Sequence, residues 1–256
     1  MQVGDFLFAG RRAVSAAAIG VGLLVASGAT SAATIVARFD STVGGTVERI
    51  IDDSTVGSTG WTSLSAGAFT FTRTGGTYGG GLMGSALDHF LAFCVEAQEG
   101  ISQGSTYTFN LLSLASGAEN IGGIGTERAN YISQLLYGVN PFAQSLTAAE
   151  NLALQMSIWE IARESTLVTG NPDFDVLTGN TRYRNASVQS VFNTANGWLD
   201  AYVNGTDSRP RLSNLVALVN DNNQDILAFA VVPEPGSLAL IGLGLAGLVT
   251  SRRRKP

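Results

Sequence analysis

Alternating and continuous apolar segments predict β-strands in the first half of the chain. Residues 68–72 alternate apolar and polar side chains, which places Phe69 and Phe71 on one face of a strand. Residues 90–95 form a continuous apolar run, the pattern of a buried strand. The glycine pair at residues 44–45 is expected to punctuate the β structure. Two further strands are expected at residues 34–39 and 107–112.

Apolar positions at helical spacing predict three helices later in the chain. The first covers residues 127–137, and Asn140-Pro141 is expected to end it. The second covers residues 152–162 and is apolar nearly all round, which predicts a buried helix. The third covers residues 187–202 and is expected to break late, at Gly197.

Local signals beside these helices complete the predicted fold. Thr147 and Glu150 have the spacing of a capping box at the start of the second helix. Residues 215–219 and 226–231 flank a polar turn and predict a β-hairpin. We therefore expect one exported domain, residues 34–231, with an α+β, β-rich fold: a β-sandwich or barrel-like domain with a helical insertion.

The N-terminal segment has the composition of a signal peptide. A basic pair, Arg11-Arg12, precedes an apolar run of small residues, and Ala32 and Ala33 offer a signal-peptidase cleavage site. The residues after the arginine pair do not favour twin-arginine export, so the Sec translocon and signal peptidase are the expected partners. Residues 1–33 are thus predicted to be removed during export.

The C-terminal segment, residues 232–256, has three parts in a fixed order. The first part is a turn, and its prolines end the preceding domain. An uncharged run at residues 236–251 follows; it is shorter than the roughly 20 residues that span a bilayer comfortably. An apolar helix followed by basic residues predicts a short transmembrane helix in the inner membrane, with its end in the cytoplasm. The turn and the basic block consist of Pro233, Glu234, Pro235, Arg252, Arg253, Arg254 and Lys255.

This tripartite tail resembles the PEP-CTERM sorting signal of Gram-negative bacteria that make exopolysaccharide. The resemblance implies that an exosortase recognises the tail, removes it and passes the protein to the cell surface or extracellular matrix. An ordinary single-span anchor is the alternative interpretation of the same residues. Either interpretation describes where the protein goes, and neither describes its activity.

Charge and cysteine content argue against a nucleic-acid partner, an internal disulfide and a zinc site. The net charge is −5 although the tail carries four basic residues, so the domain between the two signals is acidic and does not predict a nucleic-acid partner. Cys94 is the one cysteine and cannot form an internal disulfide after export. With His89 as the one histidine, the composition does not support a zinc site, and we expect no cofactor.

Two residues stand out because simple packing does not account for them. Gln155 shares an apolar helix face with Trp159, where an unpaired amide costs about 1–3 kcal/mol. The segments Phe93-Cys94-Val95 and Leu154-Gln155-Met156-Ser157-Ile158-Trp159 together resemble the two halves of the thioester-domain signature of Gram-positive surface adhesins. Gln224-Asp225, before the last strand, is a weaker cue of the same kind.

The thioester resemblance implies a single-use covalent attachment and no enzymatic turnover. In that family the cysteine sulfur and the glutamine carbonyl condense with loss of ammonia, which assigns these roles to Cys94 and Gln155. Phe93 and Trp159 would support the bond, Trp159 by keeping water away. An amine or hydroxyl on a surface target would then attack, with Gln155 as acyl donor and Cys94 as leaving group.

Three alternatives remain open at the level of sequence. A passive structural or binding protein of the exopolysaccharide matrix would keep Cys94 reduced and inert. A Cys–His hydrolase is not supported, because His89 and Cys94 have opposite parity on a regular strand and point to opposite faces. Asp173 and Asp175, with Asn171, offer oxygen ligands for Ca²⁺, but the acidic closing ligand of an EF-hand loop is missing and an acidic turn is the preferred interpretation.

Overall fold

The computed structural model describes residues 33–53, 57–58, 60–82, 88–96, 99–118, 122–164, 172–205 and 209–231. The predicted signal peptide, apart from Ala33, and the whole predicted sorting segment lie outside the described residues. Within the described part of the chain, no helix combines the length and the apolar character that crossing a membrane requires.

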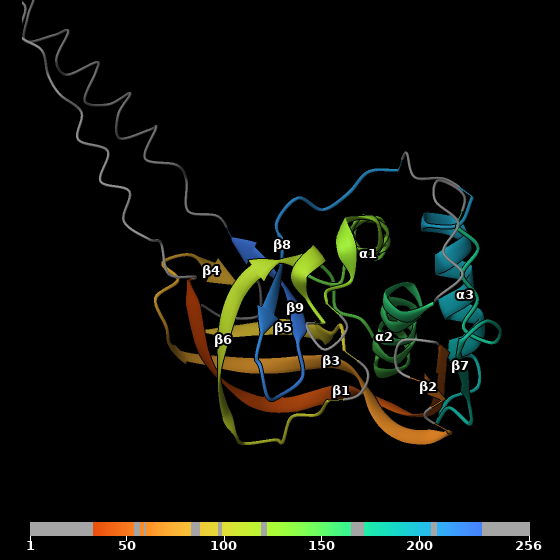
Figure 1. The fold of residues 1–256 in the computed structure, drawn as a ribbon, viewed down its shortest axis with the longest axis horizontal. Coiled ribbons are helices and arrows are strands. Elements are labelled where there is room, and N and C mark those ends of the chain that lie inside the picture. The colour runs from red at the N-terminus through yellow and green to blue at the C-terminus, as the bar shows by residue number, and fades with distance from the viewer. Residues whose placement is uncertain are drawn as a thin grey trace, which may run out of the picture. The chain divides into compact units, whose positions relative to one another are not determined.

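Six antiparallel strands close into a barrel around one apolar core (Figure 1). Each strand pairs with the next, and the last pairs with the first, so the ring has no free edge. Of the two predicted architectures, the barrel is therefore the one that forms. In order around the ring, the strands are β1 (Thr34–Asp53), β3 (Thr62–Gly75), β5 (His89–Cys94), β9 (Ile226–Val231), β8 (Leu215–Val219) and β6 (Thr106–Ser113).

Three short strands and three α-helices complete the domain. The short strands β2 and β7 pair with the far end of β1, and β4 pairs with β9. Helix α2 packs against β1, β3 and β5 and also contacts α1 and α3. The bounds are β2 (Gly57–Ser58), β4 (Gly81–Leu82), β7 (Thr181–Arg184), η1 (Leu114–Ser116), α1 (Gly125–Val139), α2 (Ala148–Arg163) and α3 (Val191–Tyr202).

The glycine pair at residues 44–45 does not interrupt the β structure, so that prediction is wrong. β1 runs through both residues, and Gly44 lies opposite Gly67 on β3. A Cβ atom on Gly44 would stand 1.9 Å from the carbonyl oxygen of Ala66, and one on Gly45 would stand 3.1 Å from Cδ2 of Leu152. Glycine is thus needed at residue 44 for the close approach of the β1 and β3 backbones, whereas a Cβ on Gly45 would first meet Oγ of Ser187, at 2.3 Å.

Helix α1 matches its prediction, whereas α3 is shorter than predicted. Asn140 ends α1 in the left-handed conformation, with φ 52°. α3 begins at Val191, and Val188 is 43% exposed where the sequence predicted a helical apolar face. Two hydrogen bonds between Ser187 and Thr46, at 2.8 and 3.2 Å, hold the preceding segment against β1. Beyond that point α3 continues through Gly197, so the predicted break is also wrong.

The predicted capping box forms at the start of α2. The Thr147 amide donates to Oε2 of Glu150 at 2.8 Å, and the Glu150 amide donates to Oγ1 of Thr147 at 3.3 Å. We expect Thr147→Ala to lower the free energy of unfolding by about 1 kcal/mol, because the first turn loses its side-chain acceptor. Urea titration measures this loss. Thr147→Ser is the control, since serine keeps the hydroxyl; an equal loss in both variants would contradict the capping role.

Candidate functional site

Cys94 and Gln155 are in contact through the backbone of Cys94. Nε2 of Gln155 donates to the Cys94 carbonyl oxygen at 2.9 Å, and Oε1 of Gln155 accepts from the Cys94 amide at 2.8 Å. Both residues are buried, Cys94 with 1% of its surface exposed and Gln155 with none. The buried amide predicted to need a partner therefore has two hydrogen bonds.

The Gln155 side chain lies where the pairing of two strands ends. β5 pairs with β3 as far as Ala92, opposite Phe69. Continuing that register would place Gly67 opposite Cys94, but no such pair forms. The carboxamide of Gln155 instead supplies the donor and acceptor that another strand residue would have offered. One residue of α2 thus extends the sheet at the position of the cysteine.

Phe93 and Trp159 hold the segment around Cys94 in different ways. Phe93 is fully buried and meets Phe142 edge-on, with ring centroids 6.3 Å apart. Nε1 of Trp159 donates to the carbonyl oxygen of Glu96 at 2.8 Å, which ties α2 to the chain just after Cys94. The Arg49 guanidinium lies over the Trp159 ring at 4.7 Å from its centroid, a cation–π contact.

The electrostatic surroundings of Cys94 favour the neutral thiol. Burial raises the pKa of the Cys94 thiol well above its usual value, while Arg49 opposes that rise and Glu96 adds to it. Burial also lowers the pKa of Arg49 to about 10, which leaves its guanidinium charged at neutral pH. The resting state therefore holds a protonated sulfur in the field of one nearby cation, and the thiolate is the minor form.

Glu96 and Asp225 form a buried, hydrogen-bonded pair just after Cys94, here called the polar bracket. Oε2 of Glu96 accepts from the Asp225 amide at 3.0 Å, and the Asp225 carbonyl accepts from the Val95 amide at 3.1 Å. The Asp225 carboxylate also accepts from the amides of Ala118 and Asn220, at 2.9 and 2.8 Å. Asp225, which the sequence analysis singled out, thus holds together the residues at the end of β5 and the start of β9.

Sequence reasoning missed Glu96 and the ionisable residues buried along α2. Glu160 has 1% of its surface exposed, and burial together with Glu164 raises the pKa of its carboxyl well above the usual value. Tyr183 on β7 is also buried, which raises the pKa of its phenol. The sequence signal was present: Glu160 follows Trp159 inside a mostly apolar helix that was predicted to be buried.

His89 and the aspartate cluster do not join Cys94. His89 is exposed at the start of β5, and its Nδ1 lies 3.0 Å from Oγ1 of Thr72. Oδ1 of Asp175 accepts from the Leu177 amide at 2.9 Å, the contact of an Asx-turn. Asp173 is exposed, and Asn171 lies outside the described residues.

The described residues contain no group of three or more histidine, cysteine, aspartate or glutamate side chains that could hold a metal ion.

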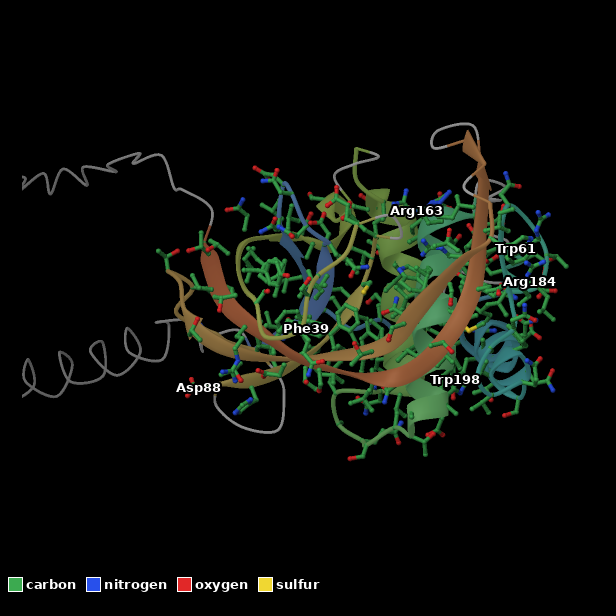
Figure 2. The ribbon with its side chains drawn as sticks, turned by 90° about the horizontal axis from the view of Figure 1, so that it is seen from below. Phe39, Trp61, Asp88, Arg163, Arg184 and Trp198 are labelled. Carbon is green, nitrogen blue, oxygen red and sulfur yellow. The ribbon has the colours of Figure 1, made fainter. Side chains whose placement is uncertain are left out.

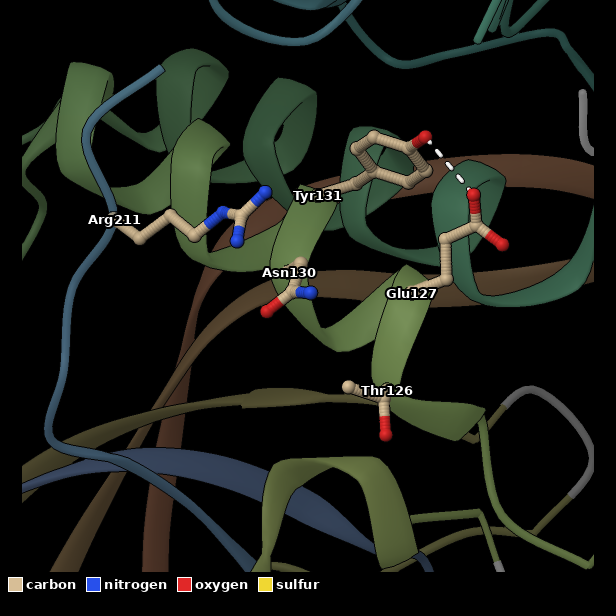
Figure 3. Close-up of a pocket in the computed structure, with 5 residues that line it drawn as sticks. All are labelled: Thr126, Glu127, Asn130, Tyr131 and Arg211. Atoms are coloured by element: carbon tan, nitrogen blue, oxygen red, sulfur yellow. Dashed lines mark hydrogen bonds between the residues drawn. The ribbon is translucent and has the colours of Figure 1, made fainter. Parts of the chain in front are cut away.

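Two pockets lie along α1, away from Cys94 and Gln155. The first has a volume of about 200 Å³, and in it the Tyr131 hydroxyl donates to Oε1 of Glu127 at 3.2 Å (Figure 3). Its lining also includes Thr126, Asn130 and Arg211. The second pocket, of about 310 Å³, is lined by Gln134, Tyr137, Gly138, Tyr202, Arg209 and Pro210. Both are separate from the thiol and its partner amide.

Comparison with known proteins identifies the tail alone. Residues 231–255 match the family model of the PEP-CTERM protein-sorting motif, which confirms the PEP-CTERM resemblance predicted for the tail. The motif implies an exported, exosortase-processed surface protein. No curated protein and no solved structure matches the chain, and the thioester-domain resemblance has no support from these comparisons.

Proposed function

We propose that this protein is delivered to the cell surface by its sorting tail and attaches there covalently through a Cys94–Gln155 thioester. The sorting motif at residues 231–255 supports delivery to the cell surface. The observation that carries the attachment is the contact of the Gln155 carboxamide with the backbone of Cys94, across 61 residues of sequence. In this role the protein acts once per molecule and is not an enzyme.

The proposed chemistry needs no reagent beyond the two side chains and the target. The Cys94 sulfur attacks the Gln155 side-chain carbonyl carbon, the thiol proton goes to the departing nitrogen, and ammonia leaves. A target amine or hydroxyl then attacks the same carbon, and its proton returns to the Cys94 sulfur as the C–S bond breaks. The product is an amide or ester between Gln155 and the target, with Cys94 as a free thiol.

Burial of the site fits a bond that must survive in water. Phe93, Gln155 and Ser157 are fully buried, and Trp159 is nearly so, which keeps solvent from the two reacting groups. The charged guanidinium of Arg49 stabilises a transient thiolate, since it acts against the burial that disfavours that form. The same burial means that a target reaches the thioester only when the covering segments move.

A second candidate function is a passive structural or binding protein of the extracellular matrix. The observation that favours it is that both polar atoms of the Gln155 carboxamide are hydrogen-bonded, which gives the residue a structural role without any covalent bond. In this case Cys94 remains a buried thiol of raised pKa.

Intact mass of the exported protein separates these two functions. We expect exported protein that has not yet met its target to be lighter than the mass of its processed sequence by one ammonia, because the condensation expels it. The Cys94→Ala variant, purified in parallel, is expected to have its full mass. If the protein without the substitution instead has the full mass of its processed sequence, and one thiol reacts after unfolding, the thioester is ruled out and the passive function remains.

A further inference from the structure

The two ends of the barrel domain lie beside one loop. This bridging segment, residues 75–82, connects the end of β3 to β4. The Thr34 amide donates to Oγ1 of Thr77 at 2.9 Å, and the Tyr78 amide donates to the Thr34 carbonyl at 3.0 Å. Gly81 in turn pairs with Val231, the last residue of β9. The first and last residues of the domain are therefore held at the same end of the barrel.

The opposite end of the domain lies far from this loop. Figure 1 places β4, the start of β1 and the end of β9 together, with β2, β7 and α3 on the other side. In Figure 2, Asp88 lies at the first of these ends, and Trp61 and Arg184 lie at the second. There the Arg184 guanidinium covers the Trp61 ring at 4.0 Å from its centroid.

The link between the barrel and the apolar run of the tail is short. Val231 ends β9, and the uncharged run begins at Gly236, five residues later. Even a fully extended chain spans at most about 18 Å over five residues. The headgroup layer on each side of a bilayer takes up about 5–8 Å of that distance. While the apolar run is in the membrane, the short link therefore limits how far the barrel end that carries Val231 can lie from the lipid headgroups.

We propose that the bridging segment and Thr34 form a membrane-facing surface that rests on lipid headgroups until the tail is cut. This inference rests on delivery by the sorting tail and on the predicted insertion of its apolar run into the inner membrane. Cys94 lies opposite Ile226, five residues before Val231, so the candidate thioester site stands roughly 17 Å further from the bilayer. The end with Trp61 and Arg184 faces away from the membrane.

The charge of the bridging segment fits this placement. Between residues 34 and 231 the chain carries 18 acidic and nine basic side chains, so an anionic bilayer repels the domain as a whole. The bridging segment itself carries no charged side chain, and Tyr78 is of the residue type enriched at bilayer interfaces. Arg73 holds the segment from within, donating to the carbonyl oxygens of Gly75, Tyr78 and Gly80.

Fluorescence quenching by spin-labelled lipid tests the orientation on the chain that lacks the predicted signal peptide, residues 1–33, and keeps the tail. The protein is inserted into vesicles of phosphatidylethanolamine and phosphatidylglycerol that contain a headgroup spin-labelled lipid. A fluorophore is attached at Gly79→Cys or, as the matched distal variant, at Ser63→Cys. Both positions are exposed, and a Cβ atom on Gly79 meets nothing within 4 Å. Buried Cys94 stays unlabelled in the folded protein, which the unmodified chain verifies.

We expect quenching at position 79 to exceed quenching at position 63 several-fold. Roughly 40 Å of strand separates Ser63 from the end of β3, so the two fluorophores should lie at clearly different distances from the spin-labelled headgroups. Equal or stronger quenching at position 63, in protein that floats with the vesicles, would overturn the orientation and leave the anchor intact. Protein that does not float with the vesicles would overturn the membrane insertion itself, and the orientation with it.

Discussion

Replacing Gln155 with alanine is expected to lower the free energy of unfolding by about 3–5 kcal/mol. The substitution removes both hydrogen-bond partners of the Cys94 backbone, at a position where no strand residue takes their place. Each buried group left without a partner costs about 1–3 kcal/mol, and the cavity left by the side chain adds to this. Few single substitutions in this domain should cost more.

Urea titration in a Cys94→Ala background measures this effect cleanly. Alanine at position 94 keeps the backbone partners of Gln155 but cannot form a thioester, so the titration reports hydrogen bonding and packing alone. Gln103→Ala is the matched control, because Gln103 is exposed and its replacement is expected to change stability by less than about 0.5 kcal/mol. A loss below about 1 kcal/mol for Gln155→Ala would contradict its role as a substitute strand residue.

Asp225→Ala is expected to cost about 2–4 kcal/mol of unfolding free energy. The Asp225 carboxylate accepts hydrogen bonds from the amides of Ala118 and Asn220, and only 1% of the residue is exposed. Without it, two backbone groups at the closed end of the β8–β9 hairpin lose their acceptor. Because this bracket also fixes the residues after Cys94, the thiol should become accessible to reagents at lower urea concentrations.

Urea titration measures the loss of stability. Labelling of Cys94 along the same urea series, with methylamine present to free the thiol from a thioester, measures its accessibility. Asp221→Ala serves as the control, since Asp221 is exposed on the same hairpin turn. Asp225→Asn keeps one acceptor oxygen and should lose less than the alanine variant. Equal losses for the Asp221 and Asp225 alanine variants would show that the buried carboxylate does not hold this end of the barrel.

Local sequence patterns predicted most elements of the fold, because those elements depend on local chemistry. The capping box of Thr147, the end of α1 at Asn140 and the last hairpin all follow from neighbouring residues. Gly44 was misread because its reason is not local: the backbone of Ala66, on another strand, occupies the space of its missing Cβ. The start of α3 was misplaced for a similar reason, since Ser187 is held by Thr46 from β1.

The candidate site also has parts that local sequence predicted and parts that it did not. The two segments that carry Cys94 and Gln155 were recognised from their residues, and the structure brings them into contact. The hydrogen-bonding role of Gln155 could not be predicted, because it depends on where the pairing of β5 with β3 stops. Arg49 was missed because its neighbour Trp159 is 110 residues away in sequence and meets it only in the folded barrel.

The order of strands around the barrel has a consequence for how an exported chain folds. β9 is the last strand of the barrel along the chain, yet it pairs between two earlier strands, β5 and β8. Until it arrives, β5 and β8 each present an open edge that invites pairing with other chains. The apolar run begins five residues after β9. The sorting motif begins at residue 231, the last residue of β9. The strand that closes both open edges of the barrel is therefore the strand directly joined to the sorting tail.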